Sequence, residues 1–363
     1  MQRLVILFAF VTVALAGIVI ASCDSDKNGG PVVVLDLTQG PRDLSGDLSG
    51  DLSGPSDMSS SSSDMSGCGD MECNPLPLHN RTSGVSKALR RVSFDGYIAV
   101  GDQGALTTSS DGITWTAGSF GAFASKSFTG VAASSTATNH YVAVAGDTIV
   151  YSTDGTSWTQ ASGNGVPTSA TDIIWSGSQF VTIGNGGVFG TSTDGAAWTT
   201  HAGGSGFANT YAFSVTYTGA KYVMVGSLSN GPFVATSPDG ATWTAQSGIS
   251  NATSQGLNFV AYGNSLLVAL GGGPSPCDIV TSTDGVTWTK QASETTLSLF
   301  TVGYTGSLWA AFGYNGLVFI SSDAITWQSG SPVGNQSIYG MTNAGPRGLV
   351  AVGDVGAIVT AEK

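Results

Sequence analysis

One seven-residue pattern occurs six times along the 363-residue chain, and its spacing constrains the fold more than any other feature. The copies read SSDGITW, STDGTSW, STDGAAW, SPDGATW, STDGVTW and SSDAITW. Their tryptophans, 39–45 residues apart, are Trp115, Trp158, Trp198, Trp243, Trp288 and Trp327. A period of about 40 residues indicates a supersecondary unit that can bury its surfaces only against neighbouring copies.

Seven apolar runs that end near glycine set the number of units. They read YIAVGD, YVAVAGD, FVTIGN, YVMVGS, LLVALGG, LWAAFG and LVAVGD. Each unit divides into four short strands joined by Gly, Asn or Asp turns, and the second strand is apolar on both faces. The sequence therefore predicts an all-β protein: a seven-bladed β-propeller of four-stranded antiparallel blades over residues 75–363.

The seventh unit is incomplete, because SIYGMTNAGPRGLVAVGDVGAIVTAEK supplies three strands and ends where its seven-residue pattern should begin. The segment LPLHNRTSG, residues 76–84, precedes the first complete unit and ends like the other fourth strands. We expect residues 76–84 to pair with the last strand, which closes the ring and covers an open sheet edge.

The repeated pattern resembles the Asp-box, or bacterial neuraminidase repeat, and runs such as AVGDVGAIVT resemble the photosystem II assembly and stability factor family. The resemblance implies a seven-bladed propeller and is compatible with sialidases, receptors and non-catalytic assembly factors. It also implies that each box is the turn between strands three and four, where the Asp accepts backbone N–H groups and the Gly takes a positive φ. The box aspartates are Asp111, Asp154, Asp194, Asp239, Asp284 and Asp323. Ala324 replaces Gly in the sixth box, which predicts another turn type or local strain.

The amino terminus is typical of a secretion signal. Residues 1–22 combine a basic start with a long apolar run, and IASC, which ends at Cys23, resembles the lipobox of bacterial lipoproteins. We expect cleavage before Cys23 and lipidation of its thiol; the alternative is an uncleaved membrane anchor. Residues 23–74 then form an Asp/Ser/Gly-rich stretch that predicts a disordered tether.

The remaining cysteines allow two arrangements. Cys68 can pair locally with Cys73, which leaves Cys277 as a buried thiol, or one of the first two can pair with Cys277. No Cys and His pair has the spacing of metal ligands, so no metal or other cofactor is expected.

The charge and the counts of particular residues argue against some classes of function. From residue 75 onward there are fourteen acidic and nine basic residues with no basic stripe, which argues against nucleic-acid binding. The few arginines and glutamates argue against a sialidase, although a glycosidase needs only two suitably placed carboxylates. Enzymatic activity is therefore uncertain, and no catalytic residue is assigned.

A binding surface is predicted on the face opposite the boxes, where loops vary in length. Its aromatic candidates are Phe120, Phe123, Phe207 and Tyr314, and its acidic candidates are Asp102, Asp147 and Asp354. The alternatives are that the aromatic residues fold back into the channel and that each Asp caps its own turn. Aromatic residues before the first turn of several units are expected to pack between blades: Phe94, Trp175, Tyr217, Tyr262 and Tyr304.

These features predict a lipid-anchored protein of the bacterial cell envelope that faces the periplasm or the exterior. We expect a non-catalytic protein-binding or assembly module with an envelope protein as its partner. One alternative is a carbohydrate-binding or glycoside-hydrolase-like propeller whose partner is a glycan, and another is a purely structural component of the envelope.

Overall fold

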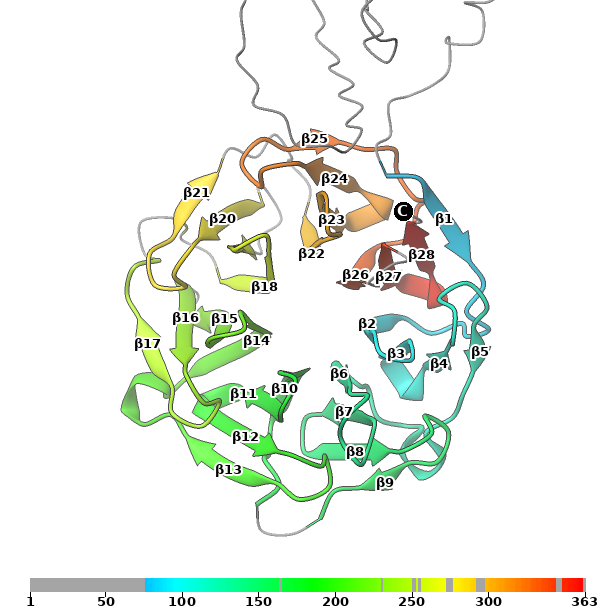
Figure 1. The fold of residues 1–363 in the computed structure, drawn as a ribbon, viewed down its shortest axis with the longest axis horizontal. Coiled ribbons are helices and arrows are strands. Elements are labelled where there is room, and N and C mark those ends of the chain that lie inside the picture. Colours follow the sequence, from blue (N-terminus) through cyan, green and yellow to red (C-terminus); the bar gives the residue numbers. More distant parts are fainter. Residues whose placement is uncertain are drawn as a thin grey trace, which may run out of the picture. The chain divides into compact units, whose positions relative to one another are not determined.

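The computed structural model of the chain describes residues 76–162, 165–229, 231–249, 253, 256–271, 277–291, 298–343 and 348–361. Within them, seven four-stranded antiparallel sheets stand as blades around a central axis (Figure 1). The predicted fold class is confirmed. No helix in these ranges has the length and apolarity that a bilayer span requires. The signal segment, Cys23, the tether, Cys68 and Cys73 lie outside the described residues.

The first four blades follow one another along the chain. Blade 1 contains β2 (Leu89–Ser93), β3 (Ile98–Gly101), β4 (Leu106–Thr108) and β5 (Thr116–Ala117). Blade 2 contains β6 (Gly130–Ala133), β7 (Tyr141–Ala145), β8 (Thr148–Ser152) and β9 (Thr159–Gln160). Blade 3 contains β10 (Ala170–Trp175), β11 (Phe180–Gly184), β12 (Val188–Ser192) and β13 (Thr199–Ala202). Blade 4 contains β14 (Thr210–Tyr217), β15 (Tyr222–Leu228), β16 (Gly231–Ser237) and β17 (Thr244–Gln246).

The last three blades complete the ring. Blade 5 contains β18 (Leu257–Gly263), β19 (Leu266–Gly271), β20 (Asp278–Ser282) and β21 (Thr289–Gln291). Blade 6 contains β22 (Leu299–Tyr304), β23 (Trp309–Gly313), β24 (Val318–Ser321) and β25 (Gln328–Ser329). Blade 7 contains β26 (Ile338–Asn343), β27 (Leu349–Gly353), β28 (Ile358–Ala361) and β1 (Leu78–Arg81).

Strand β1, from the start of the described chain, is the outer strand of blade 7. It pairs antiparallel with β28, with Leu78 opposite Ala361 and Arg81 opposite Ile358. The carboxy-terminal strand therefore has neighbours on both sides. The ring is closed by two segments from opposite ends of the sequence, as the incomplete seventh unit predicts.

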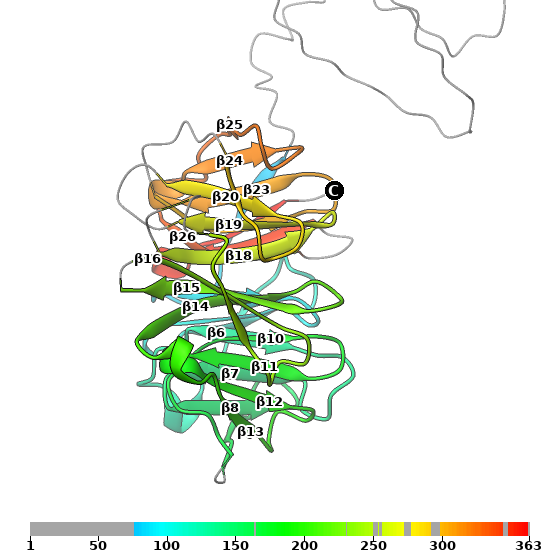
Figure 2. The ribbon, with the colours of Figure 1, turned by 90° about the vertical axis from the view of Figure 1, so that its left-hand side faces the viewer.

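Because the strands of a blade alternate in direction, the ring has two distinct faces (Figure 2). The turns between first and second strands and the six seven-residue repeats, here called boxes, lie on one face, here called the box face. The turns between second and third strands and the connections between blades lie on the other, here called the loop face. Short 3-10 helices occur on the loop face: η1 (Asp102–Gly104), η2 (Gly121–Phe123), η3 (Asn185–Gly187), η4 (Ser205–Phe207), η5 (Tyr314–Gly316) and η7 (Asp354–Gly356).

The core lies between neighbouring blades. Every residue of β3, β23 and β27 is buried, as expected for second strands that are covered on both faces. One apolar cluster joins Val350 and Val352 of blade 7 to Leu89 and Ala99 of blade 1. Blade closure is therefore stabilised by apolar burial as well as by strand pairing.

The six boxes are tight turns in which the Ser and Asp make the same hydrogen bonds each time. In the first box, Asp111 Oδ1 accepts the N–H groups of Ile113 and Thr114, each at 2.8 Å. These two backbone bonds, together with a hydrogen bond from the Ser109 hydroxyl, lower the pKa of Asp111 to about 2. The indole Nε1 of Trp115 donates to the carbonyl of the box glycine at 3.0 Å, and four of the six boxes make the equivalent bond; the Nε1 of Trp158 and that of Trp288 do not. In this geometry the carboxylate organises the turn that places its tryptophan.

Ala324 occupies the glycine position of the sixth box with the same turn. Its φ is +61, in the left-handed region, and its N–H and C=O make the bonds that the box glycines make. The sequence predicted either another turn type or local strain, and the structure keeps the turn and has the strain. A left-handed alanine costs of order 1 kcal/mol relative to glycine.

Candidate functional site

Irregular register on the inner strands shapes the central channel. Six of the seven first strands shift register near their loop-face end, which leaves one extra residue in each. The extra residues are Arg90, Thr171, Phe213, Asn258, Phe300 and Tyr339. A bulged residue leaves its backbone groups outside the strand ladder, so its carbonyl oxygen is available to another donor.

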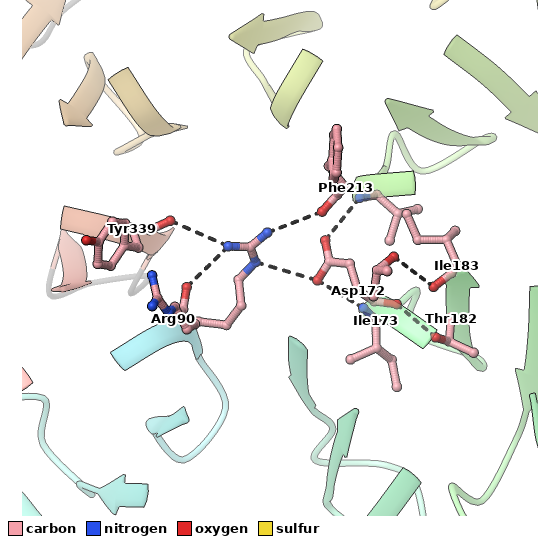
Figure 3. A network of polar contacts seen from close by, with 10 residues as sticks. Arg90, Asp172, Ile173, Thr182, Ile183, Phe213 and Tyr339 are labelled. Carbon is pink, nitrogen blue, oxygen red and sulfur yellow. Dashed lines mark hydrogen bonds and ion pairs between the residues drawn. The ribbon is translucent and has the colours of Figure 1, made fainter. Parts of the chain in front are cut away.

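Arg91 donates to three of these bulge carbonyls and so links blades across the channel. The residues that supply the carbonyls, Arg90, Phe213 and Tyr339, are labelled in Figure 3. Arg91 Nη1 donates to the carbonyl of Arg90 at 3.2 Å and to that of Tyr339, in blade 7, at 3.5 Å. Its Nη2 donates to the carbonyl of Phe213, in blade 4, at 3.3 Å. The guanidinium also lies 5.0 Å from the centre of the Phe259 ring in blade 5. One side chain therefore connects four blades.

Asp172 of blade 3 is the acidic partner of Arg91. Its Oδ1 lies 3.6 Å from Arg91 Nε, and its side chain is only 8% exposed. Its two carboxylate oxygens also accept the backbone N–H groups of Ile173 at 3.0 Å and Val215 at 3.1 Å. Burial raises the pKa of Asp172, while Arg91 and the two amides act in the opposite direction. The pair therefore links blades 1 and 3 inside the channel.

The channel is hollow on both sides of Arg91. On the box face, a cavity of about 470 Å³ has Arg91 and Asp172 at its base and inner-strand residues of all seven blades in its wall. Hydroxyl and amide groups of Ser93, Ser214 and Asn343 line it together with aromatic rings. On the loop face, Arg91 also lines a smaller cavity of about 280 Å³.

Four of the aromatic residues that precede first turns lie around the box-face cavity: Phe94, Trp175, Tyr262 and Tyr304. Trp175, Tyr217 and Tyr304 pack against apolar clusters formed by neighbouring blades, as predicted. The prediction is wrong for Phe94 and Tyr262, which are exposed. Trp175 and Tyr304 each contact a ring of the second strand in their own blade, as in the pair of Trp175 and Phe180 with centroids 4.6 Å apart, and Phe94 contacts Tyr97 in the turn before β3. Phe94 and Tyr262 remain 38% and 36% exposed, so their rings are accessible at the mouth of the cavity.

Two of the predicted loop-face anchors are not exposed. Phe120 is 1% exposed and stacks on Phe128 with ring centres 3.9 Å apart, and Phe207 is 2% exposed among other phenylalanines. The expectation of exposed anchors is wrong for these two, because their loops turn inward and bury the rings between blades. They do not plug the channel either. Phe123 is half-buried, and Tyr314 is 49% exposed.

The predicted acidic residues are engaged by neighbouring side chains. Asp102 accepts two bonds from the guanidinium of Arg90, which lies 4.5 Å from the centre of the Tyr339 ring. The hydroxyl of Tyr339 donates to Asp354 at 2.9 Å. Asp102 and Asp354 therefore meet at one contact between blades 1 and 7, and Asp147 stands apart.

Asp147 accepts a bond from Lys126 Nζ at 3.1 Å, which lowers the pKa of its carboxyl. No described group of three or more His, Cys, Asp or Glu side chains is placed to share a metal ion. The thiol of Cys277 is free and buried, and burial raises its pKa to about 11. A thiol in this state is unreactive at neutral pH.

Sequence reasoning missed Arg91 and Asp172 as partners. Both follow the extra residue of their strands, in ALRRV and SATDI, so an alignment of the first strands places them at one level of the channel. The register shift that makes this alignment meaningful is not visible in the sequence, because it depends on pairing with the second strand.

Comparisons with known proteins agree on the architecture. Residues 193–360 match the DUF6242 beta propeller domain. No curated protein is significantly similar to this chain in sequence. The solved structure described as YCF48 bound to D1 peptide superposes with a TM-score of 0.63 at 20% identity, over 79% of this chain and 97% of that one.

Two further solved structures are similar in fold. YCF48 from Cyanidioschyzon merolae has a TM-score of 0.59 at 15% identity, over 78% of this chain and 98% of that one. Virginiamycin B lyase from Staphylococcus aureus has a TM-score of 0.64 at 11% identity, over 79% and 99%. The chain is therefore a seven-bladed β-propeller that is similar, over residues 193–360, to the DUF6242 propeller domain.

Proposed function

We propose that the protein is a lipid-anchored, extracytoplasmic binding module that holds a segment of an envelope protein in the box-face cavity. The main observation in support of this proposal is the cavity itself, which is about 470 Å³ in volume and has accessible aromatic rings at its mouth and polar groups inside. A concave apolar site with a few convergent polar groups is typical of ligand recognition. Aromatic residues and arginine are also the commonest anchors of protein interfaces.

The chemistry of the cavity favours binding over hydrolysis. Asp172 is the one carboxylate among the described residues that line it. That carboxylate is already held by Arg91 and two backbone amides. A glycosidase of the common type needs a second carboxylate about 5–10 Å away.

Two further points support the proposal without deciding it. The similarly folded propeller YCF48 has been solved with a D1 peptide bound, so a propeller of this shape can hold a polypeptide segment. The lipobox-like IASC at Cys23 supports anchoring at a membrane surface outside the cytoplasm. A glycan remains the second candidate, because the exposed faces of Phe94 and Tyr262 could also stack on sugar rings.

Site-specific photocrosslinking tests the proposal in intact cells. A photoreactive amino acid replaces Tyr262 at the cavity mouth, and in separate variants it replaces Tyr211 or Tyr314 on the loop face. These two controls are 56% and 49% exposed, so both are at least as accessible as Tyr262.

We expect a protein adduct from position 262 and none from the two controls. An adduct from position 314 without one from position 262 would indicate that the binding site is on the loop face. If mass spectrometry identifies the adduct from position 262 as a glycan, the ligand is a glycan and not a protein.

A further inference from the structure

Exposed apolar side chains are unevenly distributed over the box face. Among the described residues, the large hydrophobic side chains exposed on that face are Phe94, Ile113, Tyr262, Val286 and Ile325. All five belong to blades 5, 6 and 1, which together with blade 7 form a continuous part of the ring (Figure 1). We call these five residues the apolar sector.

The repeats themselves provide the comparison that makes this distribution meaningful. Ile113, Val286 and Ile325 occupy the residue after the glycine position of their boxes and are 37%, 37% and 51% exposed. The equivalent residues of blades 2, 3 and 4 are Thr156, Ala196 and Ala241. The turn geometry does not require a large apolar residue here, because the boxes with Thr or Ala at this position form the same turn. Exposed hydrophobic residues scattered evenly over a surface are ordinary, but here they are confined to one side of the face, and such a concentration is expected where a partner binds.

The turns hold these side chains in place before any partner binds. The three sector residues that lie in boxes each donate their N–H to the box carboxylate at 2.8 Å: Ile113 to Asp111, Val286 to Asp284 and Ile325 to Asp323. A rigid turn loses little conformational entropy when its tip is covered. The sector is therefore organised as a set of fixed apolar contacts.

The charge beside the apolar tips is negative. The pKa values of Asp111, Asp284 and Asp323 are all lowered, chiefly by backbone hydrogen bonds, so the carboxylates stay ionised at neutral pH. The described box-face turns of blades 5, 6 and 1 contain no lysine or arginine. At the edge of the sector, Lys221 of blade 4 donates to the carbonyl of Asp284 at 2.8 Å. A complementary surface would place apolar side chains beside basic ones.

We infer that the apolar sector is the docking surface for the protein whose segment enters the box-face cavity, and that the docked surface presents aliphatic or aromatic side chains flanked by Lys or Arg. The inference rests on the proposed function, because Phe94 and Tyr262 belong to both the sector and the mouth of the cavity. It adds the chemistry of the partner and the side of the ring that the partner covers.

The test measures how rim substitutions affect the adduct formed at position 262 of the full chain in cells. One variant carries Ile113→Ser, Val286→Ser and Ile325→Ser. The matched control carries Thr156→Ser, Ala196→Ser and Ala241→Ser at the same turn positions in the other three blades. We expect the sector variant to lose adduct at least about tenfold and the control to change it less than about twofold, since truncation of anchors weakens binding while peripheral positions do not.

The measurement is interpreted only for variants whose melting temperature matches that of the parent protein. Equal adduct from the sector variant and its control would overturn the inference while leaving the cavity proposal intact. If position 262 forms no adduct in any variant, the proposed function itself fails.

The chemistry of the partner has its own readout. Photoreactive residues at positions 113 and 325 should crosslink to a segment that contains Lys or Arg beside apolar residues, and positions 156 and 241 should not. Adduct yield in washed membranes should also fall as salt is added, because screening weakens complementary charge. A lipid adduct, or a crosslinked segment rich in Asp and Glu, would contradict the inference.

Discussion

Replacing Arg91 by methionine should destabilise the propeller strongly, because it leaves the buried carboxylate of Asp172 without a cation. Removing one member of a buried ion pair typically costs 3–5 kcal/mol. Two features of this site reduce that cost: Asp172 keeps its two backbone N–H donors, and Arg91 is 20% exposed. Loss of the three carbonyl contacts at 3.2–3.5 Å acts in the opposite direction. We expect a decrease in the free energy of unfolding of about 3 kcal/mol at neutral pH.

The pH dependence of this loss distinguishes a charge effect from a packing effect. Burial already raises the pKa of Asp172, so the folded protein binds its proton more tightly than the unfolded chain does. A raised carboxyl pKa means that folding stability falls as pH rises through the folded value, and that the penalty is absent below the unfolded value of about 3.9. Without Arg91 this pKa should rise further. The difference between Arg91→Met and the parent should therefore be largest at neutral pH and shrink in acid.

Urea unfolding followed by tryptophan fluorescence, at about pH 7.5 and about pH 4.5, measures both quantities. Adding Asp172→Asn to Arg91→Met should recover part of the loss at neutral pH, because no buried charge remains. Lys126→Met removes the exposed ion pair with Asp147 and serves as the control that should change stability little. An equal loss at both pH values, with no recovery in the double variant, would refute the electrostatic explanation.

Gly155→Ala should cost about 1 kcal/mol, because its φ of +73 is unfavourable for alanine while a methyl group there meets only ordinary contacts; thermal unfolding measures the loss. Gly240→Ala should cost about 3 kcal/mol, because the new Cβ would also lie 2.6 Å from Val181 Cγ2, and an equal effect of the two substitutions would contradict this ordering. Deletion of residues 76–84 should lower the melting temperature and promote aggregation by uncovering the edge of β28, so an unchanged melting temperature would count against closure by β1. Cys23→Ser should move the protein out of the detergent phase on phase separation, whereas retention there would favour an uncleaved membrane helix.

Local and repeated features of this protein could be predicted from its sequence. Each box is complete within seven residues, since its Ser, Asp and Gly bond to one another inside a single turn and, in four of the six boxes, the Trp indole bonds to the same turn. Six copies and seven apolar runs then set the number of blades. Even the closure by β1 could be predicted, because a ring of four-stranded blades with one strand missing leaves an edge that only an unassigned segment can cover.

The channel, in contrast, was decided by tertiary structure. Arg91 meets carbonyls that lie 122 and 248 residues away in the sequence, and those carbonyls are free only because register shifts displace them from their ladders. The burial of Phe120 beside the exposure of Tyr314 has the same origin. Hydrophobicity gives both rings the same tendency to be buried, and the path of each loop over the assembled blades determines which one is covered.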